Sequence, residues 1–178
     1  MLDFLTDQIL PPRPSGEIPR DGQVRSILSD FSPENQRQLV MGGMQTGKTN
    51  LLSQFARQNR GHCISYFIND SPLMQSLQAF LYIMCVQMSS LLEKNSPPEN
   101  MNLEDLKNLF ETLSISLAQE ARRKNRKFYY VIDGVEYILK AGRHPIAELF
   151  PPHTAPYSPY LLFSCRSSAA NSLKNSLR

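Results

Sequence analysis

The sequence feature that most constrains the fold is the stretch VMGGMQTGKTN, which contains the pattern Gly42-x-x-x-x-Gly47-Lys48-Thr49. A short apolar run, residues 38–41, leads into it, and apolar residues at helical spacing follow from Lys48. A glycine-rich turn between a strand and a helix lets backbone N–H groups and the positive end of the helix face an anion. The stretch therefore predicts a phosphate-binding loop. The alternative is a glycine turn with a surface lysine.

Lys48 and Thr49 would supply the chemistry of such a loop. The lysine reaches the β- and γ-phosphates of a nucleoside triphosphate, and the following hydroxyl binds Mg²⁺. A second Mg²⁺ anchor is usually an aspartate at the end of a neighbouring strand. Asp133 fits, because it follows the apolar run FYYVI. We therefore expect Thr49 and Asp133 to hold Mg²⁺. The predicted nucleotide contacts in the loop are Gly42, Gly43, Met44, Gln45, Thr46, Gly47, Lys48, Thr49 and Asn50.

Apolar runs and helical patterns alternate along the chain, which predicts an α/β domain built on a parallel sheet flanked by helices in three layers. The expected strands are QLVM, CISYFIND, FYYVIDGVE and YLLFSCR. Five helices are expected: a short one near residues 21–31, one from Lys48 to about residue 59, one that begins near residue 71, one from Leu103 to about Asn125, and one at the C-terminal end. We expect Asp70 or Ser71 to cap the third, with Pro72 in its first turn, and Asn102 to cap the fourth. Residues 145–159 read as a proline-rich connection.

The residues after Asp133 narrow the class of nucleotide-binding protein. Many ring-forming ATPases have a glutamate directly after the magnesium aspartate, whereas this chain has Gly134. The stretch IDGVE resembles the Asp-Gly-x-Asp/Glu signature of the STAND class of signalling NTPases, especially NACHT-type domains. IPRDGQVRSIL, residues 18–28, resembles the segment before the loop in which an arginine-containing turn contacts the adenine side. LLFSCR resembles the strand that ends in Ser/Thr-x-Arg.

This resemblance implies specific roles for four residues. Pro19 and Arg20 would contact the nucleotide, Arg166 would sense the γ-phosphate, and Glu136 would orient the attacking water. In the family a further acidic residue commonly follows the signature, but here Tyr137 follows Glu136. That difference puts efficient hydrolysis in doubt, so the resemblance implies a switch between bound ATP and ADP in which hydrolysis is slow or doubtful.

The resemblance covers roughly residues 18–166 and only the front part of the family's nucleotide module. We expect residues 1–17 to form an extended N-terminal arm and residues 18–178 a P-loop NTPase core. The family has a further strand, a Gly-x-Pro segment, a helical and winged-helix lid and a long repeat or effector region beyond this core. We expect the last strand, the lid and the repeats to be lacking here, which would leave an open sheet edge for self-association or a protein partner.

Composition indicates where the protein is located and whether it associates with a membrane. The net charge of +3 is mild, and the three cysteines are widely spaced, as in cytosolic proteins with reduced thiols. We therefore expect a cytoplasmic protein. Residues 71–92 contain no charged side chain and are about long enough to span a bilayer. Their three glutamines and their amphipathic order favour a buried helix instead, so no membrane partner is expected.

Adenine nucleotide, bound as Mg-ATP or Mg-ADP, is the ligand that these patterns predict, and two other functions stay open. One is a DNA-associated ATPase of the AAA+ type, such as a transposition helper or helicase loader, in which the basic run Arg122, Arg123, Lys124, Arg126 and Lys127 touches phosphates. The other is a truncated domain that binds a partner and holds nucleotide weakly. A small-molecule kinase is disfavoured by the absence of an arginine-rich lid, and a GTPase by the absence of Asn-Lys-x-Asp.

Overall fold

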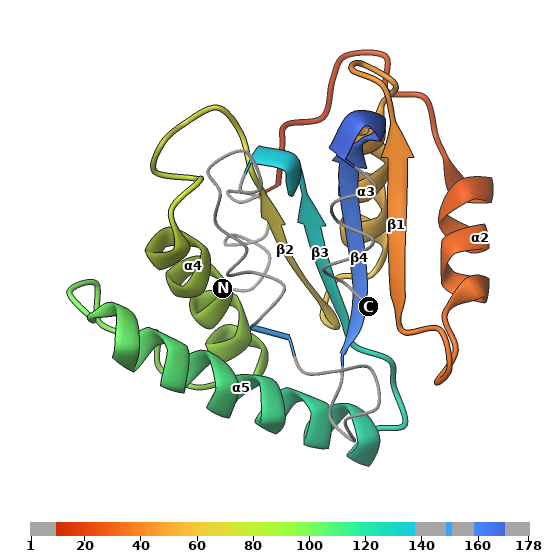
Figure 1. The fold of residues 1–178 in the computed structure, drawn as a ribbon. Helices are drawn as coiled ribbons and strands as arrows, with labels where there is room; N and C mark the ends of the chain where they lie inside the picture. The colour runs from red at the N-terminus through yellow and green to blue at the C-terminus, as the bar shows by residue number, and fades with distance from the viewer. Residues whose placement is uncertain (1–9, 138–148, 151–158, 170–178) are drawn as a thin grey trace.

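A computed structural model describes residues 10–137, 149–150 and 159–169 of the chain. They form an α/β domain whose strands point in one direction (Figure 1). The elements are α2 (Asp21–Asp30), β1 (Arg37–Gly42), α3 (Lys48–Gln58), β2 (Cys63–Phe67), α4 (Leu77–Leu91), α5 (Leu103–Arg123), β3 (Tyr129–Asp133), β4 (Tyr160–Arg166) and the short 3-10 helix η1 (Ser167–Ala169).

The described sheet has four parallel strands in the order β1-β4-β3-β2. Strand β4 therefore lies between β1, which leads into the glycine-rich loop, and β3, which ends in Asp133. In register, Gly42 pairs with Arg166, and Phe67 pairs with Asp133. All carboxyl ends consequently meet at one edge of the sheet, where ligands bind in open α/β folds.

Helices cover both faces of the sheet, as the sequence predicts. Along β3, Tyr130 and Ile132 pack into the core formed with α4 and α5, whereas Tyr129 and Val131 pack into the core formed with α2 and α3. Both sets of side chains are buried, which explains why the strand reads as a continuous apolar run rather than an alternating one.

The start of α4 corrects one prediction. Neither Asp70 nor Ser71 caps this helix, and Pro72 lies outside it. The helix begins at Leu77, where the Ser76 side chain accepts a hydrogen bond from the N–H of Ala79. The preceding segment is held in a turn by hydrogen bonds that include Tyr66 Oη to the backbone oxygen of Met74 at 3.0 Å and Gln75 Nε2 to the backbone oxygen of Asn69 at 3.0 Å.

A side chain of α4 forms hydrogen bonds with the backbone of β2, the edge strand of the described sheet, at one position. The Gln87 amide accepts from the N–H of Ser65 at 2.9 Å and donates to its C=O at 2.8 Å. These groups of β2 have no neighbouring strand on that side among the described residues, since β2 pairs with β3 on the other. The Gln87 side chain therefore takes the place of a strand partner.

Two other predictions about helices have different outcomes. Asn102 caps α5, as predicted, by accepting from the N–H of Asp105 at 2.9 Å. The helix predicted at the C-terminal end falls mostly outside the described residues, as does most of the proline-rich connection. Of the helices that the structure describes, none is both long and apolar enough to cross a membrane.

Candidate nucleotide-binding site

The glycine-rich loop joins β1 to α3 at the carboxyl edge of the sheet (Figure 1). Gly47, the residue before the helix, has φ +83°, a conformation that favours glycine. It supplies no side-chain cap, so the first N–H groups of α3 have no side-chain partner from this position. Uncapped N–H groups and the helix dipole make this end of α3 suited to an anion.

Lys48 bends back over the loop. Its Nζ donates to the carbonyl of Gly42 at 3.0 Å and to that of Gly43 at 2.6 Å. The Thr46 hydroxyl also donates to Gly43, at 3.1 Å, and a Cβ added at Gly42 would lie 2.7 Å from that hydroxyl oxygen. The turn thus leaves no room for a side chain at Gly42 and places the ammonium beside the N-terminus of α3, where both would contact a phosphate.

Thr49 and Asp133 meet, as the sequence predicts for a shared Mg²⁺ site. The Thr49 hydroxyl donates to Asp133 Oδ2 at 2.6 Å. The other carboxylate oxygen accepts from the hydroxyl of Ser164 on β4, which also accepts from the N–H of Gly134 at 3.2 Å. A carboxylate and a hydroxyl oxygen are the hard oxygen ligands that Mg²⁺ takes, so the donor set fits this ion.

Ser164 was not identified from the sequence. It precedes Arg166 by two residues on the same strand, and it reaches Asp133 only because β4 lies beside β3. The Ser-x-Arg pattern was the sequence signal that could have identified this serine. The strand order places its hydroxyl next to the Asp133 carboxylate.

Glu136 and Arg166 lie together beyond the end of β3. Arg166 Nε is 3.3 Å from Glu136 Oε1, and its Nη2 donates to the Tyr137 hydroxyl at 3.0 Å. The arginine also lies over the Tyr137 ring, 5.4 Å from its centroid. Glu136 is 5% exposed, and its second oxygen is buried with no hydrogen-bond partner. This oxygen is an unsatisfied hydrogen-bond acceptor next to the cleft.

Arg20 lies against the loop, whereas Pro19 is exposed next to it. The guanidinium of Arg20 occupies the space that a Cβ at Gly47 would need. Its backbone N–H donates to Gln54 Oε1 at 2.8 Å, and Gln54 Nε2 donates to the carbonyl of Ile18 at 2.9 Å. Gln54, which the sequence reading missed, therefore fixes this segment to α3.

A cleft of about 730 Å³ unites most of these residues. From the predicted set it is lined by Met44, Gln45, Lys48, Thr49, Asp133, Glu136 and Arg166. A hollow of about 330 Å³ contains Thr46, Gly47 and Asn50 as well. Pro11 and Pro12 line both, because the segment before α2 crosses over the carboxyl ends of the strands (Figure 1). Pro19 and Arg20 line neither of these two spaces.

Comparisons with known proteins find similarity in structure but not in sequence. No protein-family model and no curated protein matches the sequence. Among solved structures, the crystal structure of Cdc6p from Pyrobaculum aerophilum matches 96% of this chain, with 14% sequence identity and a TM-score of 0.45. The match covers 47% of that protein, so the chain spans about half its length. The assignment of a P-loop NTPase-like fold rests on the sheet and loop geometry described above.

Proposed function

We propose that the chain binds Mg-ATP and Mg-ADP and acts as a nucleotide switch of the STAND class, similar to NACHT domains. The observation that carries this proposal is the 2.6 Å contact between Thr49 and Asp133, which brings the last residue of the loop to the aspartate of another strand. A glycine turn without a ligand does not need a buried carboxylate beside its threonine. A nucleotide site does, because Mg²⁺ takes one ligand from each.

Different residues of the site would bind different parts of the Mg-nucleotide. The N-terminus of α3 and Lys48 would hold the phosphates, and Thr49 and Asp133 would hold Mg²⁺, which neutralises phosphate charge when bound. Ser164 would keep the Asp133 carboxylate oriented through its hydroxyl. Arg20 and Pro19 would contact the nucleotide beyond the loop, in keeping with the position of Arg20 against Gly47.

Slow hydrolysis is part of the proposal. Glu136 is the residue near the cleft that would orient water, but Arg166 is paired with it at 3.3 Å. In this arrangement the Arg166 guanidinium occupies one oxygen of Glu136, so the pair has to open before that oxygen can orient a water. Arg166 must leave Glu136 before it can reach a γ-phosphate, and Tyr137 holds it through a second contact.

Isothermal titration with Mg-ATP tests the proposal. Lys48→Ala should weaken binding at least about tenfold, because a charge-assisted hydrogen bond to phosphate contributes about 1.5–3 kcal/mol. Lys107→Ala removes the same charge from a half-buried position on α5 that does not line the cleft, and it should leave the affinity unchanged. Asp133→Asn should abolish the dependence on Mg²⁺. A folded preparation that binds no nucleotide, or whose binding ignores Lys48→Ala, would refute the proposal.

DNA binding by an AAA+ type ATPase is the second candidate. Its supporting observation is the cluster of five basic residues at the end of α5, all of which are exposed. No carboxylate is among the described residues that line the adjoining cavity. Binding to duplex DNA that weakens as salt rises, and that charge reversal in the basic run weakens further, would favour this candidate. No binding at low salt would remove it.

The proposal of a nucleotide switch also includes self-association, or binding of a protein partner, through an edge of the sheet. At β2 the outward N–H and C=O of Ser65 are already bonded to Gln87. An added strand would have to displace that side chain. Analytical ultracentrifugation with and without Mg-ATP tests whether the chain associates.

A further inference from the structure

We propose that a cavity at the amino edge of the sheet binds a small organic anion with a flat apolar body. The cavity has a volume of about 470 Å³ and lies between the end of α5 and the first residues of β3 and β4. The nucleotide cleft lies at the opposite, carboxyl edge of the sheet, where β1 leads into α3 and β3 ends (Figure 1). The inference is independent of the proposed function.

The walls suit a flat apolar group. Small side chains on one face of α5 leave space, and aromatic rings from β3 and β4 border it. The apolar and aromatic lining residues are Pro33, Leu117, Ala118, Ala121, Phe128, Tyr130, Pro159 and Tyr160. Pockets of this size with apolar walls and a few polar groups are the usual form of small-molecule sites.

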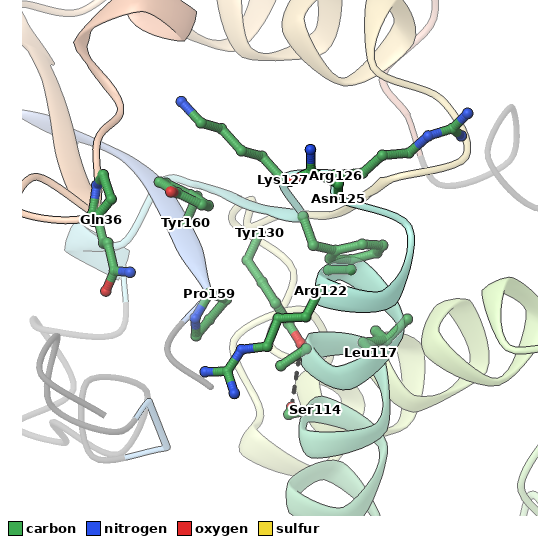
Figure 2. A pocket seen from close by; sticks show the side chains of 14 residues that line it. Gln36, Ser114, Leu117, Arg122, Asn125, Arg126, Lys127, Tyr130, Pro159 and Tyr160 are labelled. Carbon is green, nitrogen blue, oxygen red and sulfur yellow. Dashed lines mark hydrogen bonds between the residues drawn. The ribbon is translucent and has the colours of Figure 1, made fainter. Parts of the chain in front are cut away.

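Arg122 gives the cavity its charge. Figure 2 shows its guanidinium directed into the space between α5 and Pro159, whereas the Arg126 side chain points away. Arg122 forms no ion pair with any described residue. Its neighbours differ, because Glu120 binds both Arg123, at 2.6 Å, and Lys124, at 2.8 Å. An exposed arginine that lines a partly apolar pocket and has no carboxylate partner among the described residues is suited to a carboxylate, sulfonate or phosphate.

The other charged and polar groups support the same ligand. No carboxylate is among the 14 described residues that line the cavity. Lys127 adds positive charge at the rim, where its Nζ donates to the carbonyl of Phe31 at 2.5 Å and lies 5.2 Å from the Tyr160 ring centroid. An anion therefore meets attraction and no like charge from the lining residues.

The cavity also contains polar side chains other than Arg122 that a ligand could contact, namely Gln36 and the hydroxyls of Tyr130 and Ser114. The side-chain oxygen of Gln36 is buried and accepts no hydrogen bond. Tyr130 and Ser114 bond to each other through their hydroxyls, at 3.3 Å, on the side of α5 (Figure 2). A ligand N–H or O–H near Gln36 would satisfy that acceptor, whose burial is otherwise unfavourable. The ligand class is thus an aromatic or similarly flat anion that carries a donor.

A matched pair of fluorescent probes tests this site. Anilinonaphthalene sulfonate carries a flat naphthalene ring, a sulfonate and an N–H group, and phenylnaphthylamine has the same rings without the sulfonate. Arg122→Gln should weaken binding of the sulfonate about five- to tenfold, as expected for loss of a charge-assisted contact near the surface, and change binding of the neutral probe less than about twofold. Arg123→Gln removes the same charge from an adjacent position that does not line the cavity, and it should change neither.

Three results would overturn the proposal. One is the absence of saturable sulfonate binding by the folded wild-type chain. Another is an equal loss in Arg122→Gln and Arg123→Gln, which indicates a diffuse basic surface for a polyanion such as DNA. The third is displacement of the sulfonate by Mg-ATP in simple competition, which places the probe in the other cleft. Retention of sulfonate binding in the presence of saturating Mg-ATP supports the site at the amino edge.

Discussion

Gln87→Met tests whether the Gln87 side chain stabilises the edge strand β2. Gln87 is 8% exposed and Ser65 is 3% exposed, so water has little access to the two bonds between them. Methionine fills a similar volume but neither donates to a carbonyl nor accepts strongly from an N–H. The substitution therefore leaves the N–H and C=O of Ser65 buried without partners.

The expected loss follows from those two groups. A buried N–H or C=O without a partner costs about 1–3 kcal/mol, so the pair costs about 2–6 kcal/mol. Removing the buried amide of Gln87 itself offsets about 1–2 kcal/mol. The midpoints of these two ranges, about 4 and about 1.5 kcal/mol, give an expected fall in the free energy of unfolding of about 2.5 kcal/mol.

Urea unfolding followed by far-UV circular dichroism measures this change, since the chain has no tryptophan to report it. Gln78→Met is the matched control, because Gln78 is exposed on the same helix and makes a single long bond, 3.4 Å, to a backbone carbonyl. The control should change stability by less than about 0.5 kcal/mol. If Gln87→Met costs no more than the control, the side chain does not stabilise the edge in the way proposed here.

Three further predictions concern other parts of the fold. Gly47→Ala should lose about 1–2 kcal/mol of stability, because φ is +83° there. Gly22→Ala, in the first turn of α2 where a Cβ would meet nothing within 4 Å, should gain up to about 0.5–1 kcal/mol; urea unfolding of both variants compares them. Burial, and secondarily the charge of Arg126, lowers the pKa of His62, so the folded state favours neutral imidazole and loses stability as pH falls below 6.5; an NMR titration midpoint at or above 6.5 would contradict this. Burial raises the pKa of the Cys85 thiol to about 12, so a disulfide reagent should modify Cys85 only after unfolding, as mass spectrometry of the labelled peptide can show.

The sequence was sufficient for the parts of the fold that depend on local patterns. The α/β class follows from apolar runs such as the one before Asp133, and the structure confirms it. The N-terminus of α5 was predicted at the right residue because Asn102 caps through a contact only three residues away. Local contacts of this kind are visible in the order of residues.

The start of α4 could not be predicted in the same way. Ser71 and Ser76 are both suitable caps, and apolar spacing continues back to Leu73. The choice depends on tertiary contacts, such as the bond from Tyr66 to the backbone of the turn. Leu73 is 69% exposed in the structure, so it does not belong to the buried stripe of the helix.

The contacts between site residues on different strands could not be predicted from the sequence, because they depend on the strand order. Pairing of Arg166 with Glu136 and of Ser164 with Asp133 requires β4 to lie beside β3. Nothing in an individual strand specifies its neighbour. The roles assigned to the site residues stay predictions until nucleotide binding is measured.

The position of β4 also has a consequence for biosynthesis. Arg37, at the start of β1, pairs with Leu161, 124 residues later in the chain. A ribosome adds about 5–20 residues per second, so β1 is made about 6–25 s before its partner. Throughout that interval the strand leading into the glycine-rich loop lacks β4, its partner among the described strands. Translation speed and chaperone access should therefore affect the yield of this protein more than that of a domain whose paired strands are adjacent in sequence.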